Sequence, residues 1–150
     1  MLEQMETLLL DGEPAIENKG VRARLADFYL RISGLANTNL RTLSALSRGQ
    51  PPGPEASISK LVATEQLVDQ AAFALDLQGM AGILTGDTLA TAGGAYQDSY
   101  MRDLCMRIAG GTDEIIRNTI AERVLGLPPD IRIDKMAPFT ELPPSVAPRS

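Results

Sequence analysis

The sequence predicts an all-α fold, an up-down helical bundle over residues 1–127 followed by an extended proline-rich tail over residues 128–150. Two observations support this prediction. Apolar residues recur every three or four positions along most of residues 1–127, which is the spacing of one helix face. The apolar residues are also mainly aliphatic, because aromatic residues make up 4% of the chain and tryptophan is absent. This usage favours helices over sheets.

Composition excludes several classes of function. The chain has 150 residues, enough for one domain, and a net charge of −5 with scattered arginines, so neither nucleic acid nor an anionic membrane surface is an expected partner. Histidine is absent, which excludes Ser-His-Asp and Cys-His catalysis and histidine-ligated metals, and we predict no metal site. The sequence has no signal peptide and no apolar run of about 18 residues, so it predicts a cytoplasmic protein without a membrane span.

The first predicted helix is short and covers residues 1–10. No capping residue precedes it, so we expect it to be the end of a longer helix. The segment Asp-Gly-Glu-Pro at residues 11–14 is expected to end it. Its apolar side is formed by Leu2, Met5, Leu8 and Leu9.

Residues 15–48 are the longest periodic run and predict one long helix. A loop follows at residues 49–54 (GQPPGP), because glycine and proline interrupt helices. The next helix is predicted from Pro54 to about Gly79, with Lys60 and Thr64 on its solvent side. Helices of this length need partners of similar length, which indicates a bundle. The apolar stripe of the long helix runs through Val21, Leu25, Phe28, Ile32, Leu35, Leu43 and Leu46.

A glycine- and threonine-rich segment, residues 82–96, is expected to be a loop with one helical turn at most. The helix after it is predicted to be capped by Asp98 or Ser99 and to run to about residue 109. Its apolar stripe consists of Met101, Leu104, Cys105 and Ile108, and we interpret Cys105 as a buried small hydrophobic residue.

A double glycine separates this helix from the last one. Gly110 and Gly111 are expected to make a sharp turn, because glycine adopts backbone conformations that other residues avoid. Thr112 then caps the last helix, with Asp113 and Glu114 in its first turn, where negative charge suits the positive end of the helix dipole. The buried face of this helix is predicted to contain Ile116, Ile120, Val124 and Leu127.

The stretch from Tyr100 to Leu127, YMRDLCMRIAGGTDEIIRNTIAERVLGL, resembles the C-terminal signature of acyl-CoA dehydrogenases. That signature reads roughly RD…I-x-E-G-T-x-E-I-x-R…IA-x-R-x-L-G. Weaker similarity reaches upstream to Val21, so the resemblance covers about residues 21–127. It implies the four-helix bundle that forms the C-terminal domain of this family, here with its first helix shortened. The matching positions are Arg102, Asp103, Ile108, Gly111, Thr112, Glu114, Ile115, Arg117, Ile120, Ala121, Arg123, Leu125 and Gly126.

The resemblance implies a role in fatty acid metabolism, the α,β-dehydrogenation of an acyl-CoA substrate with FAD as cofactor. In this family the domain helps to bind FAD, often that of a neighbouring subunit, and forms the core of the oligomer. Many members also supply a glutamate base from it. Gly110 occupies that glutamate position here, so no catalytic residue is assigned. The base then lies in the first helix, before Met1 by rough register or at Glu3 or Glu6, or it belongs to a partner subunit.

Four residues are candidates for cofactor binding by resemblance. Gly111, Thr112 and Glu114 match the segment that lies along the flavin, although helix capping alone would also select the threonine and the glutamate. Gly79 lies where the family often has a Q-x-x-G-G-x-G segment that touches the cofactor. Asp76 and Met80 depart from that pattern.

Three hypotheses about function follow. The chain is the C-terminal domain of an acyl-CoA dehydrogenase, or the same fold in a non-catalytic subunit of a heteromeric enzyme, or a helical-bundle interaction module without enzymatic role. In the first two it belongs to a homo- or hetero-oligomer. The isolated chain is expected to be inactive and not to hold FAD tightly, because the β-domain that would shield a flavin is missing from the sequence.

Overall fold

The computed structural model describes residues 2–51, 53–54, 56–86, 90–129 and 138–141. Helices dominate these residues, which confirms the predicted all-α fold class. The main helices are α1 (Leu2–Thr7), α2 (Lys19–Ser47), α3 (Ala56–Gln78), α4 (Ala95–Met106) and α5 (Asp113–Arg123). Short 3-10 turns are η1 (Ala15–Glu17), η2 (Gly79–Ile83), η3 (Thr91–Gly94) and η4 (Phe139–Glu141), and the two short strands are β1 (Leu9–Leu10) and β2 (Glu13–Pro14).

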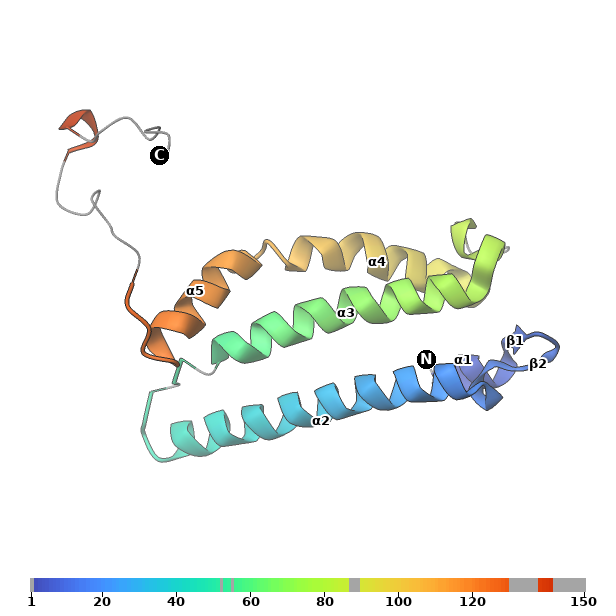
Figure 1. Ribbon diagram of the computed structural model, residues 1–150, viewed down its shortest axis with the longest axis horizontal. Coiled ribbons are helices and arrows are strands. Elements are labelled where there is room, and N and C mark those ends of the chain that lie inside the picture. Colours follow the sequence, from blue (N-terminus) through green and yellow to red (C-terminus); the bar gives the residue numbers. More distant parts are fainter. Residues whose placement is uncertain (1, 52, 55, 87–89, 130–137, 142–150) are drawn as a thin grey trace, which may run out of the picture.

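Helix α3 is the centre of the bundle. It runs antiparallel to α2 on one side and to α4 and α5 on the other, so the three long segments form an up-down arrangement (Figure 1). The predicted loop at 49–54 connects α2 to α3 within one residue of the expected positions. No helix in the described part of the chain is long and apolar enough to cross a membrane.

Helix α1 is shorter than predicted, because residues 9–14 form a β-hairpin instead. Leu9 pairs with Pro14 and Leu10 with Glu13, around a two-residue turn. Asp11 and Gly12 both have positive φ, +55° and +88°, which is the conformation of the tight turn that best joins two antiparallel strands. The Asp-Gly dipeptide is the sequence signal for such a turn.

Helix α2 begins at Lys19, later than the predicted start at residue 15. The side chain of Asn18 accepts hydrogen bonds from the backbone N–H groups of Gly20 and Val21, at 2.8 and 3.2 Å, and so caps the helix. Residues 15–17, predicted as helix, form the 3-10 turn η1 before this cap.

The best-packed core lies at one end of the bundle, where α1, η1, the start of α2 and the end of α3 meet (Figure 1). Its buried residues are Met5, Ala15 and Val21. Phe28 of α2 and Phe73 of α3 add an edge-to-face ring contact, with centroids 5.8 Å apart. Half-buried residues around this core are Leu8, Leu10, Ile16, Leu25 and Leu77.

The predicted apolar stripe of α2 is covered only over its first half. Val21 and Phe28 are buried, whereas the later stripe residues Ile32, Leu43 and Leu46 are 50%, 59% and 47% exposed. The cause is that α1 is short and covers only the start of the stripe, where its Met5 packs with Val21. The second half of α2 therefore presents a row of exposed apolar side chains.

Helix α3 has no fully solvent-facing side, contrary to the prediction for Lys60 and Thr64. Thr64 is 4% exposed and bonds to backbone carbonyls of its own helix, and Lys60 is half-buried. Gln66, also buried, donates to the carbonyl oxygen of Phe28 on α2 at 2.8 Å. A helix that contacts neighbours on two opposite sides buries polar positions that periodicity assigns to solvent.

Helix α4 begins at Ala95, before the predicted caps Asp98 and Ser99. Gly94 precedes it with a φ of +79°, and Asp98 lies in the first turn. The predicted apolar stripe of α4 faces outward, so Cys105 is exposed rather than buried. The reason is that α4 packs against α3 through another face. The buried residues of α4 are Gln97 and Asp103, and the Gln97 amide donates to the carbonyl oxygens of Gly82 and Leu84 at 3.1 and 2.9 Å.

Helix α5 only partly confirms its predicted buried face. Ile116, Ile120 and Val124 are half-buried, whereas Leu127 is 52% exposed and lies beyond the end of the helix. Most of the predicted tail, residues 130–137 and 142–150, lies outside the described residues.

Candidate functional site

The turn between α4 and α5 carries the residues with the strongest resemblance. Its two glycines adopt left-handed conformations, with φ of +68° at Gly110 and +106° at Gly111. The backbone N–H of Asp113 donates across the turn to the carbonyl oxygen of Arg107, at 3.2 Å. The predicted sharp turn is therefore confirmed. Since other residues avoid positive φ, both glycines are suited to it.

Thr112 caps α5 as predicted. Its hydroxyl accepts from the backbone N–H of Ile115 at 3.4 Å. The exposed carboxylate of Glu114 lies in the same first turn, where its own backbone N–H and the Thr112 hydroxyl hold its pKa below the ordinary value. Glu114 is therefore ionised at neutral pH and presents acceptor oxygens to solvent beside the turn.

A buried cluster of charges lies beneath this turn. The side chain of Asp113 is 3% exposed and contacts Arg107 Nε at 2.6 Å and Lys60 Nζ at 3.5 Å. Lys60 Nζ also donates to the carbonyl oxygen of Gly111 at 2.8 Å. Burial alone would raise the pKa of Asp113, but the hydrogen bond and charge of Arg107, followed by those of Lys60, outweigh it and lower the pKa.

The depressed pKa of Asp113 predicts a loss of stability in acid. A carboxyl group whose pKa is lower in the folded state stabilises the fold above its unfolded pKa of about 3.9. This contribution is lost as pH falls from there through the folded pKa. Urea unfolding of the wild type and Asp113→Asn between about pH 2 and pH 6 should show a stability difference that is constant above about pH 5 and shrinks below it. A difference that is independent of pH would contradict the prediction.

Gly110 lies on the surface of the turn. It is exposed, and no atom approaches within 4 Å of the position that a Cβ would occupy. Gly111 is closer to its surroundings, since a Cβ there would meet Cδ1 of Ile116 at 3.4 Å. Gly110 thus leaves its part of the backbone open to solvent, whereas Gly111 is half-buried against Ile116.

Gly79 does not join the other three candidate residues. It lies just beyond the carboxyl end of α3, whereas Lys60, which contacts the α4–α5 turn, lies near the start of that helix (Figure 1). The two residues are 19 positions apart, which corresponds to about 28 Å of helix. One flavin ring therefore cannot touch both places. The neighbouring Gly82 has a packing role, because a Cβ there would approach the carbonyl oxygen of Leu75 to 2.6 Å.

The α4–α5 turn carries hydrogen-bonding groups of the kind that would hold a flavin. The ionised Glu114 can accept a hydrogen bond from a ring N–H or a ribityl hydroxyl of FAD, and the Thr112 hydroxyl, whose proton goes to Glu114, can accept one. The N–H groups of Asp113 and Ile115 already have partners within the turn, so they are not open to an anion. Over the part of the chain that the structure describes, no group of three or more Cys, Asp and Glu side chains could hold a metal ion.

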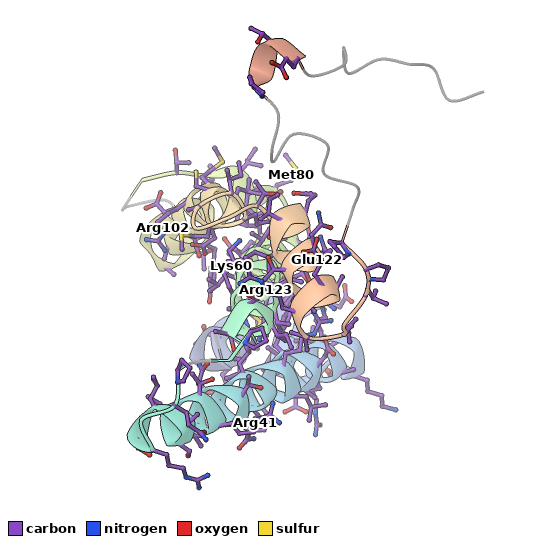
Figure 2. All side chains as sticks on the ribbon, turned by 90° about the vertical axis from the view of Figure 1, so that its left-hand side faces the viewer. Arg41, Lys60, Met80, Arg102, Glu122 and Arg123 are labelled. Carbon is purple, nitrogen blue, oxygen red and sulfur yellow. The ribbon has the colours of Figure 1, made fainter. Side chains whose placement is uncertain are left out.

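Sequence reasoning missed the residues that hold the turn in place. Figure 2 shows Lys60 near the centre of the bundle, whereas Arg41 lies at its outer side on α2. Periodicity predicts Lys60 on the solvent side of its helix, and the sequence predicts Asp113 only as a favourable charge in the first turn of α5. The pairing of residues 53 positions apart depends on how α3 meets α5, which no local pattern reports.

Comparison with known proteins identifies the family. The acyl-CoA dehydrogenase C-terminal domain matches residues 1–125. An acyl-CoA dehydrogenase of Mycolicibacterium smegmatis, IpdE1, is 32% identical over 119 residues, which are 79% of this chain and 28% of the relative. This chain thus spans less than a third of that curated relative.

Solved structures agree with the family assignment. The ChsE4-ChsE5 complex from Mycobacterium tuberculosis contains a chain that matches 85% of this one with a TM-score of 0.71 and 25% identity, over 33% of its own length. The steroid ACAD Tcur3481-Tcur3483 matches 76% of this chain with a TM-score of 0.67 and 23% identity, over 30% of that chain, and this likeness shows the fold. The chain belongs to the acyl-CoA dehydrogenase family and comprises its C-terminal helical domain.

Proposed function

We propose that this chain acts within an FAD-dependent acyl-CoA dehydrogenase, where it supplies one wall of a flavin site and part of the oligomer core. The observation that carries the proposal is the α4–α5 turn. Gly110 leaves its part of the backbone open, and Thr112 and Glu114 present hydrogen-bonding groups beside it. Thr112 and Glu114 would hold part of the flavin, which would supply the hydride acceptor for α,β-dehydrogenation of an acyl-CoA thioester, while a base outside this turn would take the α-proton.

Gly79 takes a separate part in this proposal. Gly79 lies about 28 Å along α3 from Lys60, the residue that contacts the α4–α5 turn. It therefore contacts a different portion of FAD or the FAD of a neighbouring subunit. Gly79 is exposed and has a φ of +54°, and no atom lies within 4 Å of the position that a Cβ would occupy. A partner molecule can therefore approach its backbone.

The proposal predicts that the 150-residue chain alone holds no flavin, whereas a full-length protein that includes it does. The turn is only one exposed wall, and a flavin needs to be enclosed to bind tightly. Purification with added FAD, followed by visible absorbance, is the measurement. Thr112→Val together with Glu114→Gln should weaken FAD binding to the full-length protein about tenfold, the effect of about 1.4 kcal/mol from lost hydrogen bonds.

A matched control for this experiment is Thr119→Val with Glu122→Gln, the same pair of changes farther along α5. The control should leave FAD affinity unchanged. A full-length protein that binds no FAD would contradict the proposed function. If the purified 150-residue chain retained flavin and were yellow, the proposal that the turn is only one wall of the site would be contradicted.

A second candidate is a non-catalytic subunit of a heteromeric acyl-CoA dehydrogenase. Gly110 favours it, because glycine cannot accept a proton where many members of the family have a glutamate base. The ChsE4-ChsE5 complex is a precedent for two different chains in one assembly. Co-purification with a homologous chain that has glutamate at this position would favour this candidate over a complete homomeric enzyme.

The uncovered half of the α2 stripe supports the oligomer-core role. Exposed apolar side chains in a row on one helix face are typical of an interface. Besides Ile32, Leu43 and Leu46, this surface includes Leu40, which is 58% exposed.

We therefore predict that the chain self-associates or binds a homologous chain through the second half of α2. Leu43→Glu should weaken this association at least about tenfold, because it places a charge in an apolar interface. Leu30→Glu is the matched control, since Leu30 is 67% exposed on the same helix but lies off the stripe. Light scattering over a concentration series measures the effect. A wild-type chain that stays monomeric at millimolar concentration, with and without a homologous partner, would contradict the prediction.

A further inference from the structure

One lysine connects the central helix of the bundle to the α4–α5 turn. Lys60 extends from the second turn of α3, and its Nζ donates to the carbonyl oxygen of Gly111 at 2.8 Å. The same ammonium group lies 3.5 Å from Asp113. The side chain of Lys60 is 23% exposed, so most of its length is buried between the helices.

The bond to Gly111 acts on the least restrained part of the turn. Gly110 and Gly111 have no side chains to hold them, and glycine has the widest range of backbone conformations. The next residues are fixed by their own bonds, from Asp113 N–H to the carbonyl of Arg107 and from Ile116 N–H to the carbonyl of Thr112. Lys60 supplies the contact from another helix that fixes the double glycine relative to the rest of the domain.

We propose that Lys60 is a positioning residue, which holds the Gly110–Gly111 turn in the conformation that presents Thr112 and Glu114 to FAD. The part of this inference that concerns FAD rests on the function proposed above. Lys60 does not touch the reacting atoms in this proposal. Its role is to hold the carbonyl of Gly111 and to share Asp113 with Arg107, so that the first turn of α5 starts at a fixed place.

The first test uses the 150-residue chain without flavin. In Lys60→Met the apolar stem remains, and Asp113 keeps its hydrogen bond to Arg107, so the domain should stay folded. Amide hydrogen exchange of Asp113 and Ile116, measured by NMR, should accelerate at least about tenfold relative to amides of α3 such as Ala74. Lys60→Arg should restore slow exchange, since a guanidinium can donate to both a carbonyl and a carboxylate.

The matched control is Lys19→Met, which removes the same charge from an exposed position at the start of α2. It should leave exchange in the turn at the wild-type rate. Unchanged exchange in Lys60→Met would overturn the inference. So would an acceleration of the same size in α3 and in the turn, because Lys60 would then stabilise the whole domain rather than position this segment.

The second test measures FAD affinity in the full-length protein. Lys60→Met should raise the Kd for FAD about tenfold, whereas Lys60→Arg and Lys19→Met should keep it within about threefold of the wild type. Equal affinity in Lys60→Met and wild type would overturn the link to FAD. If the wild-type full-length protein bound no FAD, the proposed function would fail, while the exchange experiment would still decide whether Lys60 holds the turn.

Discussion

Replacing Asp113 by alanine should lower the free energy of unfolding by about 2 kcal/mol. The substitution leaves Lys60 and Arg107 as two positive charges without their shared carboxylate, and Asp113 itself is 2% exposed. Removing one partner of a fully buried ion pair costs about 3–5 kcal/mol. The expected loss is smaller here because the Arg107 side chain is 42% exposed and regains water.

Urea unfolding at neutral pH measures this loss. The matched control is Asp69→Ala, since Asp69 also contacts two cationic side chains, Arg24 at 3.7 Å and Arg31 at 3.8 Å, but is 45% exposed. Surface ion pairs contribute about 0–1 kcal/mol, so the control should lose less than half as much stability as Asp113→Ala. Equal losses in the two variants would mean that burial does not strengthen the cluster beneath the turn.

Local signals in the sequence predicted most of the fold. The stripe that begins with Val21 predicted the long helix, and the proline-glycine segment at 49–54 predicted its connection to α3. The bounds of α1 and α2 were predicted wrongly, although a local signal for each is present in the sequence. Asn18 is a typical helix cap and Asp11-Gly12 a typical hairpin turn, and each outweighed the apolar periodicity around it.

The candidate site was harder to predict, because it depends on contacts between distant segments. The turn itself followed from Gly110, Gly111 and Thr112, which are adjacent in sequence. The bond from Lys60 to Gly111 joins residues 51 positions apart and could not be inferred from either segment. The buried face of α4 was also unpredictable from the sequence. The buried residues of this helix are the polar Gln97 and Asp103, whereas its apolar stripe is exposed.

Gly110→Glu should have the largest effect on activity, because a positioned general base contributes about 10²- to 10⁴-fold to rate. The position is exposed, and no atom lies within 4 Å of the place where a Cβ would be, so the new side chain has room at its base. The φ of +68° costs a non-glycine residue about 1–2 kcal/mol. This cost is smaller than the free energy of unfolding of a typical domain, so the variant should still fold. If the parent protein is a non-catalytic subunit with an intact pocket, the new carboxylate should add acyl-CoA-dependent dye reduction.

Two control variants separate the carboxylate from the backbone strain. Gly110→Ala introduces the strain alone, and Gly110→Gln adds a side chain of the same size that cannot take a proton. Activity that rises in Gly110→Glu and in neither control would assign the missing base to this position. If a base already acts from the first helix ahead of Met1, a second carboxylate would crowd the site, and activity should fall or stay level. Glu6 cannot be that base, because α1 packs with Leu77 at the end of α3 that lies away from the α4–α5 turn. If neither the parent nor the variant bound acyl-CoA, the enzymatic role itself would be contradicted, because a proton acceptor has no use without a substrate held within hydrogen-bond reach.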